Sequence, residues 1–191
     1  NSLVTVPDGQ PIVWIARNLG FKNIQKTSGL DLMKEIFKIS YKNNFSHFFY
    51  GSSKNVLDEI VRKISSDYPG VKVVGQESPP FLEYHQFDYQ KILEKIEEKN
   101  PDFFWVGLGA PKQEFFMNEL NKKNPKCIQI GVGLAFDYYS NNVKRAPVFL
   151  RKLGLEWFFR ILSQPNRVNF KSLIAIFWII IPLLKSILWK K

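Results

Sequence analysis

The chain has 191 residues, of which 45% are hydrophobic and 23% charged, so its composition excludes an intrinsically disordered protein and allows one domain of ordinary size. Its single cysteine, Cys127, excludes an internal disulfide framework and is typical of a reducing compartment. The net charge is +10, and +9 of it lies in residues 144–191, which hold ten Lys and Arg residues and one acid, Glu156. Positive charge this concentrated among large apolar residues indicates a phosphate-bearing partner: a nucleic acid, a nucleotide or a lipid headgroup.

In chain order, short apolar runs predict strands, and the stretches between them have apolar residues at helical spacing. The predicted strands are residues 3–6, 48–50, 71–74, 103–106 and 127–130. The predicted helices are residues 11–18, 30–41, 54–67, 89–98 and 111–122, and the first and last of them start at a proline. Because strand, glycine turn and helix recur at the spacing of βαβ units, residues 1–143 are predicted to form an α/β domain with a mostly parallel sheet flanked by helices.

Glycine-containing turns follow several of the predicted strands. These turns are Asp8-Gly9, Gly51-Ser52-Ser53, Gly107 to Ala110 and Gly131 to Gly133. The carboxyl ends of parallel strands share one edge of a sheet, and ligands of such sheets bind beyond that edge. The sequence therefore predicts a ligand site at this edge.

Asp8 is a candidate general base, because it follows a predicted strand and precedes a glycine at the expected site. The alternative is an ordinary turn residue, since Asp-Gly is a common turn pair. The residues alone leave both interpretations open.

The segment Gly107-Leu-Gly109-Ala-Pro-Lys112-Gln113-Glu114 puts a flexible turn at a helix N-terminus, where free backbone N–H groups favour an anion. It matches neither the dinucleotide fingerprint nor the Walker loop, so a tight strand-to-helix connection is the alternative. Gly131 to Asp137 has the same form, and Asp137 there is typical of a helix cap or turn residue.

No metal site is predicted. His47 and His85 have no Cys or acidic cluster at ligand spacing, and His47 is interpreted as structural. An Asp-x-Asp pair, which holds a divalent metal under a nucleotide-sugar diphosphate, is also missing. A diphosphate ligand would have to be neutralised by cations and helix ends instead.

Residues 144–191 are predicted to be a helical, basic and apolar C-terminal appendage. Arg145, Arg151, Arg160 and Arg167 together favour phosphate contact, although each arginine alone is better explained by solvation or packing. Residues 173–184 are an unbroken apolar run that would cover about 18 Å as a helix, short of the ~30 Å hydrocarbon core. A helix lying in the membrane interface fits best; a longer spanning helix and a core helix are the alternatives.

Together these motifs resemble the WecG/TagA/CpsF family of glycosyltransferases, in order and spacing, over about residues 3–167. The motifs are Asp8-Gly9, Thr27-Ser28-Gly29-Leu-Asp31, Gly107-x-Gly-x-Pro-Lys-Gln-Glu114, Gly131-Val-Gly-x-x-Phe-Asp137, Lys144-Arg-Ala-Pro147 and Gly154-Leu-Glu-Trp-x-x-Arg160 followed by Gln164-Pro-x-Arg167.

The resemblance implies an inverting, metal-independent transferase on a Rossmann-like domain. Its expected partners are a UDP-sugar donor, typically carrying N-acetylmannosamine, a polyprenyl-diphosphate-linked sugar acceptor, and the cytoplasmic face of the bacterial membrane, to which it would bind peripherally. Its products would enter teichoic acid or other cell-surface polysaccharides, and nucleic acid is not an expected partner. Whether the protein is a monomer or a homo-oligomer stays open.

By the same resemblance Asp8 is the catalytic base, Gln113 lies in the sugar-nucleotide site, and the C-terminal arginines close over the site. The expected substrate-binding residues are Lys26, Gly51, Gly107, Gly109, Lys112, Gln113, Glu114, Gly131, Asp137, Arg145, Arg151, Arg160 and Arg167. No metal or other cofactor is expected.

The chain departs from the family pattern in three places. The family has a segment before the Asp-Gly motif, with a loop that lines the active site, so a preceding segment is expected to be missing here. The basic position before Thr27 is usually Arg and is Lys26 here, which keeps the charge but loses the bidentate fork. The part after Phe170 is more apolar than the family pattern.

Two other functions remain as alternatives. Basic charge beside Trp157, Phe158 and Phe159 fits a non-catalytic module that binds nucleic acid or an anionic membrane. A nicotinamide dehydrogenase is disfavoured, because the dinucleotide fingerprint is missing.

Overall fold

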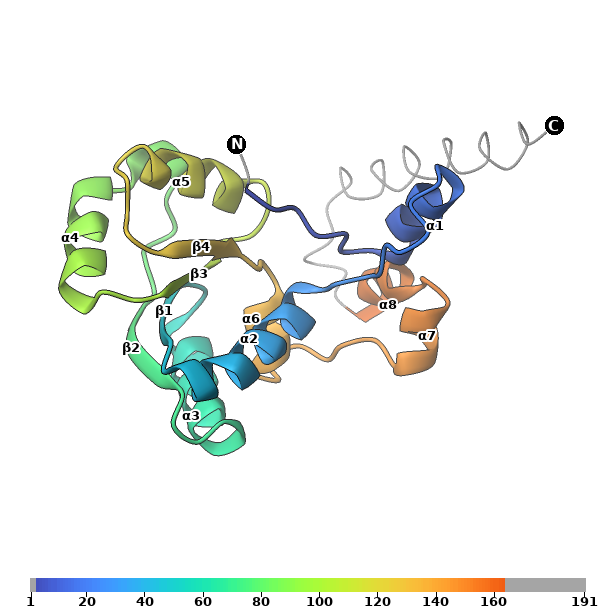
Figure 1. Cartoon of the computed structure of the whole chain (residues 1–191), viewed down its shortest axis with the longest axis horizontal. Helices are drawn as coiled ribbons and strands as arrows, with labels where there is room; N and C mark the ends of the chain where they lie inside the picture. Colours follow the sequence, from blue (N-terminus) through green and yellow to red (C-terminus); the bar gives the residue numbers. More distant parts are fainter. Residues whose placement is uncertain (1–2, 164–191) are drawn as a thin grey trace. The chain divides into compact units, whose positions relative to one another are not determined.

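The computed structural model describes residues 3–163, which form two compact units (Figure 1). One unit is residues 29–144, and the other combines residues 3–28 with residues 145–163. Arg167 and the apolar run at 173–184 lie outside the described residues.

The unit of residues 29–144 is built on a parallel sheet of four strands. They are β1 (Ser46–Gly51), β2 (Lys72–Glu77), β3 (Phe103–Gly107) and β4 (Ile128–Gly131), in the order β2-β1-β3-β4. Each contains most of a predicted strand, so the α/β class and the parallel sheet are confirmed.

The predicted strand at residues 3–6 is wrong, because these residues are not in a strand. Leu3 and Val4 are exposed and have no neighbouring strand. Their apolar character suits a strand, but a strand forms only where a ladder partner exists. As a consequence, Asp8 does not follow a strand.

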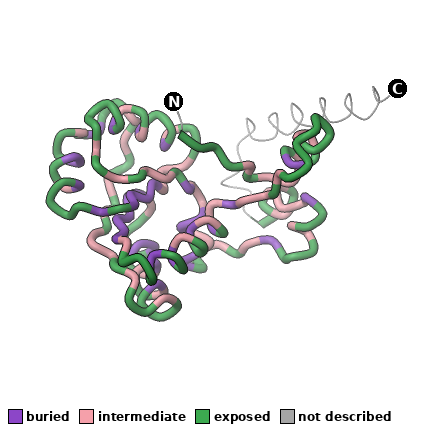
Figure 2. The backbone as a smooth tube through the Cα atoms, in the orientation of Figure 1, coloured by how far each residue is buried: buried purple, intermediate pink, exposed green. Residues whose placement is uncertain are grey.

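Helices cover both faces of the sheet (Figure 1). Helices α2 (Gly29–Asn43), α3 (Lys54–Asp67) and α6 (Ala135–Tyr139) pack on one face, and α4 (Tyr89–Lys99) and α5 (Lys112–Asn121) pack on the other with the short turn η1 (Tyr84–Gln86). The buried positions follow β1 and β3 continuously (Figure 2), as expected for strands covered on both faces.

His47 lies in the aromatic core of this unit. It is fully buried, and its Nδ1 accepts a hydrogen bond of 2.9 Å from the indole Nε1 of Trp105. Its ring stacks on Phe103 and meets Phe37 edge-on. Loss of hydration lowers the pKa of His47 to about 4, so the ring is neutral at pH 7. His47 is therefore structural, as predicted.

The second unit contains three helices, α1 (Gln10–Asn18), α7 (Val148–Lys152) and α8 (Glu156–Ser163). Gly154, between α7 and α8, has φ +70°. A Cβ on it would lie 2.8 Å from the Trp14 ring and 3.2 Å from Cβ of Gln10, so α1 packs directly on this turn. Only glycine both adopts this positive φ readily and fits the space between these side chains. Among the described residues, no helix is long and apolar enough to cross a bilayer.

His47 makes the stability of the protein depend on pH. Its pKa is about 4 in the folded state and about 6.5 in the unfolded state, so its contribution is complete above about pH 6.5 and is lost as the pH falls towards 4. Between pH 7.5 and 4.5 we expect the wild type to lose on the order of 2 kcal/mol more unfolding free energy than His47→Gln, which cannot titrate and keeps an acceptor for Trp105. Urea denaturation at both pH values measures this, and equal losses in both proteins would contradict it.

Candidate functional site

The carboxyl edge of the sheet has its switch point between β1 and β3, because the strand order grows outward from these two strands in opposite directions. The last residues of the two strands, Gly51 and Gly107, are paired in register. A Cβ on Gly51 would lie 2.6 Å from the carbonyl carbon of Gly107, and Gly51 has φ +119°. A Cβ on Gly107 would lie 2.4 Å from the Phe136 ring, so close packing requires glycine at the ends of both strands.

Ser52, directly after β1, has a backbone conformation that is unfavourable for serine. Among the described residues, the non-glycine residues with positive φ are four asparagines and Ser52, whose φ is 58°. Its N–H donates to the carbonyl of Gly107 at 3.2 Å. Asparagine tolerates this region of φ and serine does not favour it, and such strain is concentrated at functional sites.

Gln113 joins the turn after β3 to the turn after β4. Its side chain is buried, Oε1 accepts from the Gly133 N–H at 3.0 Å, and Nε2 donates to Oε1 of Glu114 at 3.0 Å. A Cβ on Gly131 would lie 3.1 Å from Nε2 of Gln113 and 2.8 Å from Cε of Met117. The structure thus brings together three predicted residues, Gln113, Glu114 and Gly131. Both ends of the Gln113 amide are engaged in hydrogen bonds within the protein.

Gly109 and Lys112 lie on either side of the start of α5. Gly109 has φ +81° and open space around the position of a Cβ, so glycine is required there by its conformation. Lys112 donates to the carbonyl of Leu82 at 3.1 Å and lies 4.2 Å above the Phe81 ring. Lys112 therefore anchors the loop that follows β2.

Asp137 lies in α6 and accepts a hydrogen bond of 2.6 Å from Nδ2 of Asn142. This contact ties the end of the short helix to the segment that follows it. Asp137 is not a helix cap, because Leu134 is the N-cap of α6 and Asp137 lies in the first turn of the helix.

The second unit contains a cluster of charged side chains around Glu156, which we call the Glu156 cluster: Lys26, Arg145 and Glu156. Oε2 of Glu156 accepts from Nζ of Lys26 at 2.7 Å, and Oε1 lies 3.3 Å from Nε of Arg145. Nη2 of Arg145 also donates to Oγ of Ser28 at 2.8 Å. The three charged side chains are only 15–18% exposed, so both ion pairs are largely shielded from water.

Asp8 lies within electrostatic range of this cluster. The Thr27 N–H donates to the Pro7 carbonyl at 3.0 Å, which brings the segments that carry Asp8 and Lys26 together. Asp8 keeps access to solvent, yet the protein around it raises the pKa of its carboxyl, mainly by loss of hydration and then through Glu156. Lys26, Arg145 and Arg160 lower that pKa without cancelling the rise.

The four predicted arginines differ in position. Arg145 and Arg160 act electrostatically on Asp8, and Arg160 is itself exposed. Arg151 is not among the charges that act on Asp8, and its buried Nε has no hydrogen-bond partner within residues 3–163. Arg167 lies outside the described residues.

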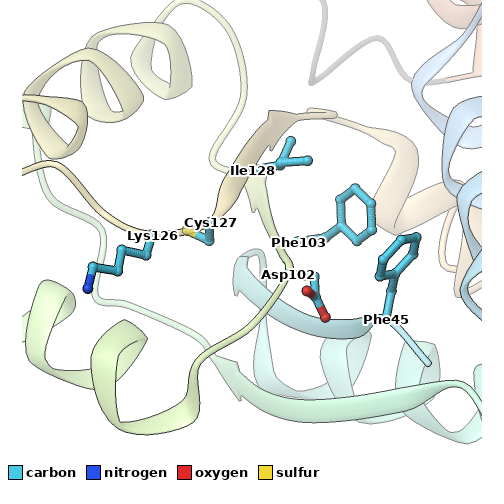
Figure 3. A pocket seen from close by; sticks show the side chains of 6 residues that line it. All are labelled: Phe45, Asp102, Phe103, Lys126, Cys127 and Ile128. Carbon is cyan, nitrogen blue, oxygen red and sulfur yellow. The ribbon is translucent and has the colours of Figure 1, made fainter. Parts of the chain in front are cut away.

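A pocket of about 310 Å³ opens at the opposite, amino edge of the sheet, around the first residues of β3 and β4 (Figure 3). The Asp102 carboxylate in it accepts from the backbone N–H and the hydroxyl of Ser46, at 2.7 and 2.8 Å, and the backbone hydrogen bond lowers its pKa. Burial raises the pKa of the Cys127 thiol to about 11. The acid is thus already paired and the thiol is protonated, so neither Asp102 nor Cys127 is a reactive group in this pocket.

Residues 3–163 contain no group of three or more His, Cys, Asp and Glu side chains that could hold a metal ion. The predicted site residues fall into two sets, one at the carboxyl edge of the sheet and one around Asp8. The expected site residues did not include Ser28, Ser52 or Glu156, although all three lie in turns or motifs that the sequence singled out. Glu156 was also marked as the single acid in a basic segment.

Comparison with known proteins gives consistent matches. A family model described as "Glycosyl transferase WecG/TagA/CpsF family" matches residues 1–191. The N-acetylglucosaminyldiphosphoundecaprenol N-acetyl-beta-D-mannosaminyltransferase of Bacillus subtilis (strain 168) is 36% identical over 162 residues, which cover 85% of this chain and 61% of the relative. The protein with the same name from Bacillus spizizenii is 32% identical with the same coverage. The chain thus spans 61% of the length of these relatives.

Replacing Gln113 by Met should destabilise the unit of residues 29–144. Methionine keeps most of the volume but leaves the Gly133 N–H without its acceptor, so we expect a loss of about 1–3 kcal/mol of unfolding free energy. The matched control is Gln76→Met at an exposed position, expected to change stability by less than about 0.5 kcal/mol. Chemical denaturation of both variants measures the difference, and equal effects would exclude the positioning of the Gly131–Gly133 turn by Gln113.

Proposed function

Because the chain belongs to the WecG/TagA/CpsF glycosyltransferase family, we propose that it is an inverting, metal-independent glycosyltransferase. Its donor is a UDP-sugar of the N-acetylmannosamine type, and its acceptor is a sugar on a polyprenyl diphosphate. The names of the two Bacillus relatives, which state an N-acetylmannosaminyl group and an N-acetylglucosaminyl-diphosphoundecaprenol, support these substrate classes. The product would enter teichoic acid or another bacterial cell-surface polymer.

The observation that carries the proposal is that the charges of Lys26, Arg145 and Arg160 act on Asp8, whose segment is joined to that of Lys26 by the hydrogen bond from Thr27 to Pro7. A general base works best when its pKa lies near the pH at which the enzyme operates. The protein raises the pKa of Asp8 and so brings it closer to that pH. Lys26, Arg145 and Arg160 supply positive charge beside this base, which suits an acceptor that carries a diphosphate. A carboxylate base and a phosphate-binding group are the two components that transfer to such an acceptor requires.

In the proposed reaction, Asp8 accepts the proton of an acceptor hydroxyl as its oxygen attacks the anomeric carbon of the donor. The new C–O bond forms as the bond from that carbon to the β-phosphate oxygen breaks, and UDP leaves with the bonding pair. Attack opposite the leaving group inverts the anomeric configuration. The cations near Asp8 stabilise phosphate charge during this step without needing a metal ion.

For the nucleotide of the donor we propose the carboxyl edge of the sheet at β1 and β3, in the manner of a Rossmann-like domain. Gly109 leaves open space there, and backbone N–H groups at the start of α5 favour phosphate. Gln113 contributes by holding the turn after β4 in place rather than through a free amide.

We further propose that the protein binds peripherally to the cytoplasmic face of the membrane through α7 and α8. Phe149 and Leu153, at α7, are 62% and 59% exposed, and Phe158 and Leu162 on α8 are exposed as well. Lys152 and Arg160 lie among them in the sequence, and this mixture of apolar and basic side chains suits an anionic lipid surface.

The family match favours the enzyme over a non-catalytic nucleic-acid or membrane-binding module. Such a module has no use for a carboxylate placed among its cations, because that carboxylate repels phosphate. The arrangement around Asp8 is thus better explained by catalysis.

Asp8→Asn should abolish transfer and leave nucleotide binding intact. Asparagine has the same shape but cannot accept the proton, so we expect kcat to fall at least about 100-fold and the Kd for UDP to stay within about threefold. Mass spectrometry of products from UDP-N-acetylmannosamine and a short-chain polyprenyl-diphosphate-N-acetylglucosamine, in buffer containing EDTA, measures transfer. The control is Asp88→Asn at the start of α4, where asparagine caps equally well. Full activity of Asp8→Asn would remove Asp8 from the mechanism.

Membrane binding can be tested with vesicles that contain phosphatidylglycerol. Burial of each large apolar side chain contributes up to about 1.5–3 kcal/mol, so Phe149→Ser with Leu153→Ser should lower the partition coefficient at least about tenfold in a flotation assay. Ile39→Ser, at an exposed position on α2, is the control and should bind as the wild type does. Equal binding of all three proteins would exclude α7 from the contact.

A further inference from the structure

Glu156 stands out in the second unit because it binds two cations at once. Lys26 and Arg145 contact different oxygens of its carboxylate, at 2.7 and 3.3 Å. Lys26 and Glu156 are 130 positions apart in the sequence, so the contact joins the segment before α2 to the first residue of α8. One side chain thus sets the position of both cations.

Stability alone does not explain this carboxylate. Removing an ion pair from water costs free energy that mutual attraction often only balances, so a shielded pair is weak support for a stabilising role. Glu156 is also the single acid among residues 144–191, where the other charged residues are cations. Its position in the first turn of α8 suits the helix dipole, but that effect would be the same for an exposed acid.

Asp8 lies in the electrostatic field of the same groups. The charges that act on it are Lys26 from the segment before α2, Arg145 from the segment before α7, and Glu156 and Arg160 from α8. Three of these are cations, and each favours the ionised form of Asp8, which weakens it as a base. Glu156 is the one group that opposes them.

We propose that Glu156 is a positioning residue for the transfer reaction. It holds Lys26 and Arg145 in place and offsets part of their charge at Asp8. The two cations can then attract phosphate while Asp8 keeps enough proton affinity to act as the base. This inference rests on the proposed function, in which Asp8 is the base. It assigns to Glu156 a role through Asp8 and the two cations rather than contact with the reacting atoms.

The decisive variant is Glu156→Gln in the full chain, because glutamine keeps the size of the side chain and removes only the charge. The proposal expects the acid limb of the kcat/KM profile to move to lower pH by at least about 0.5 units, and kcat at pH 7.5 to fall about threefold to tenfold. Glu156→Asp, which keeps the charge, should return the limb towards its wild-type position. A limb that stays in place in Glu156→Gln would overturn the proposal.

A charge-balanced double variant distinguishes the effect of the Glu156 charge from the structural effect of losing the ion pair. Lys26→Met with Glu156→Gln removes one positive and one negative charge near Asp8, so the acid limb should return close to its wild-type pH although the ion pair is gone. If the limb instead follows the single variant Glu156→Gln, the charge of Glu156 is not what acts on Asp8. Glu59→Gln, which removes an exposed ion pair with Arg62 on α3, is the control and should leave the profile unchanged.

A second measurement separates this inference from the proposed function. The ¹³C resonance of the Asp8 carboxyl, assigned by its loss in Asp8→Asn, reports protonation in the intact chain without any substrate. Its midpoint should be lower in Glu156→Gln than in the wild type. An unshifted midpoint overturns the role of Glu156, whereas a shifted midpoint in a protein without transferase activity supports that role and contradicts the proposed function alone.

Discussion

The ion pairs of Glu156 with Lys26 and Arg145 are the constraint on which the second unit depends. They join residue 26 to residues 145 and 156, and the hydrogen bond from Arg145 to Ser28 reinforces the same junction. The chain before α2 is therefore organised by contacts with the C-terminal segment and not by strand pairing. Glu156, the single acid among residues 144–191, lies at this junction.

The sheet could be predicted from the sequence because the patterns that specify it are local. β3 was recognised from a continuous apolar run, and α4 from apolar residues at helical spacing. Residues 3–6 carry a similar apolar pattern and still form no strand, because pairing requires a partner in space. A short apolar segment does not specify its partner, so the apolar pattern of residues 3–6 could not by itself tell a strand from an unpaired segment.

The site was predictable in its composition but not in its contacts. Glycines at 51 and 107 follow from strand ends that approach each other, and a concentration of arginines is visible in any charge count. That the amide of Gln113 is bound by Gly133 and Glu114 is a tertiary fact, invisible to spacing. The same holds for Glu156, whose two partners come from distant parts of the sequence.

Under the proposed function, in which Asp8 is the base, the arrangement around Asp8 resolves a conflict between two requirements. A group that binds phosphate must be positive, whereas a carboxylate base loses proton affinity as positive charge accumulates near it. Distance alone cannot satisfy both when one acceptor carries the reacting hydroxyl and the diphosphate. A shielded acid between the cations lowers the net field at the base and leaves the cations in place, because an ion pair orients its partners as well as neutralising them. For that reason the single acid of a basic segment is as informative about this chemistry as the arginines around it.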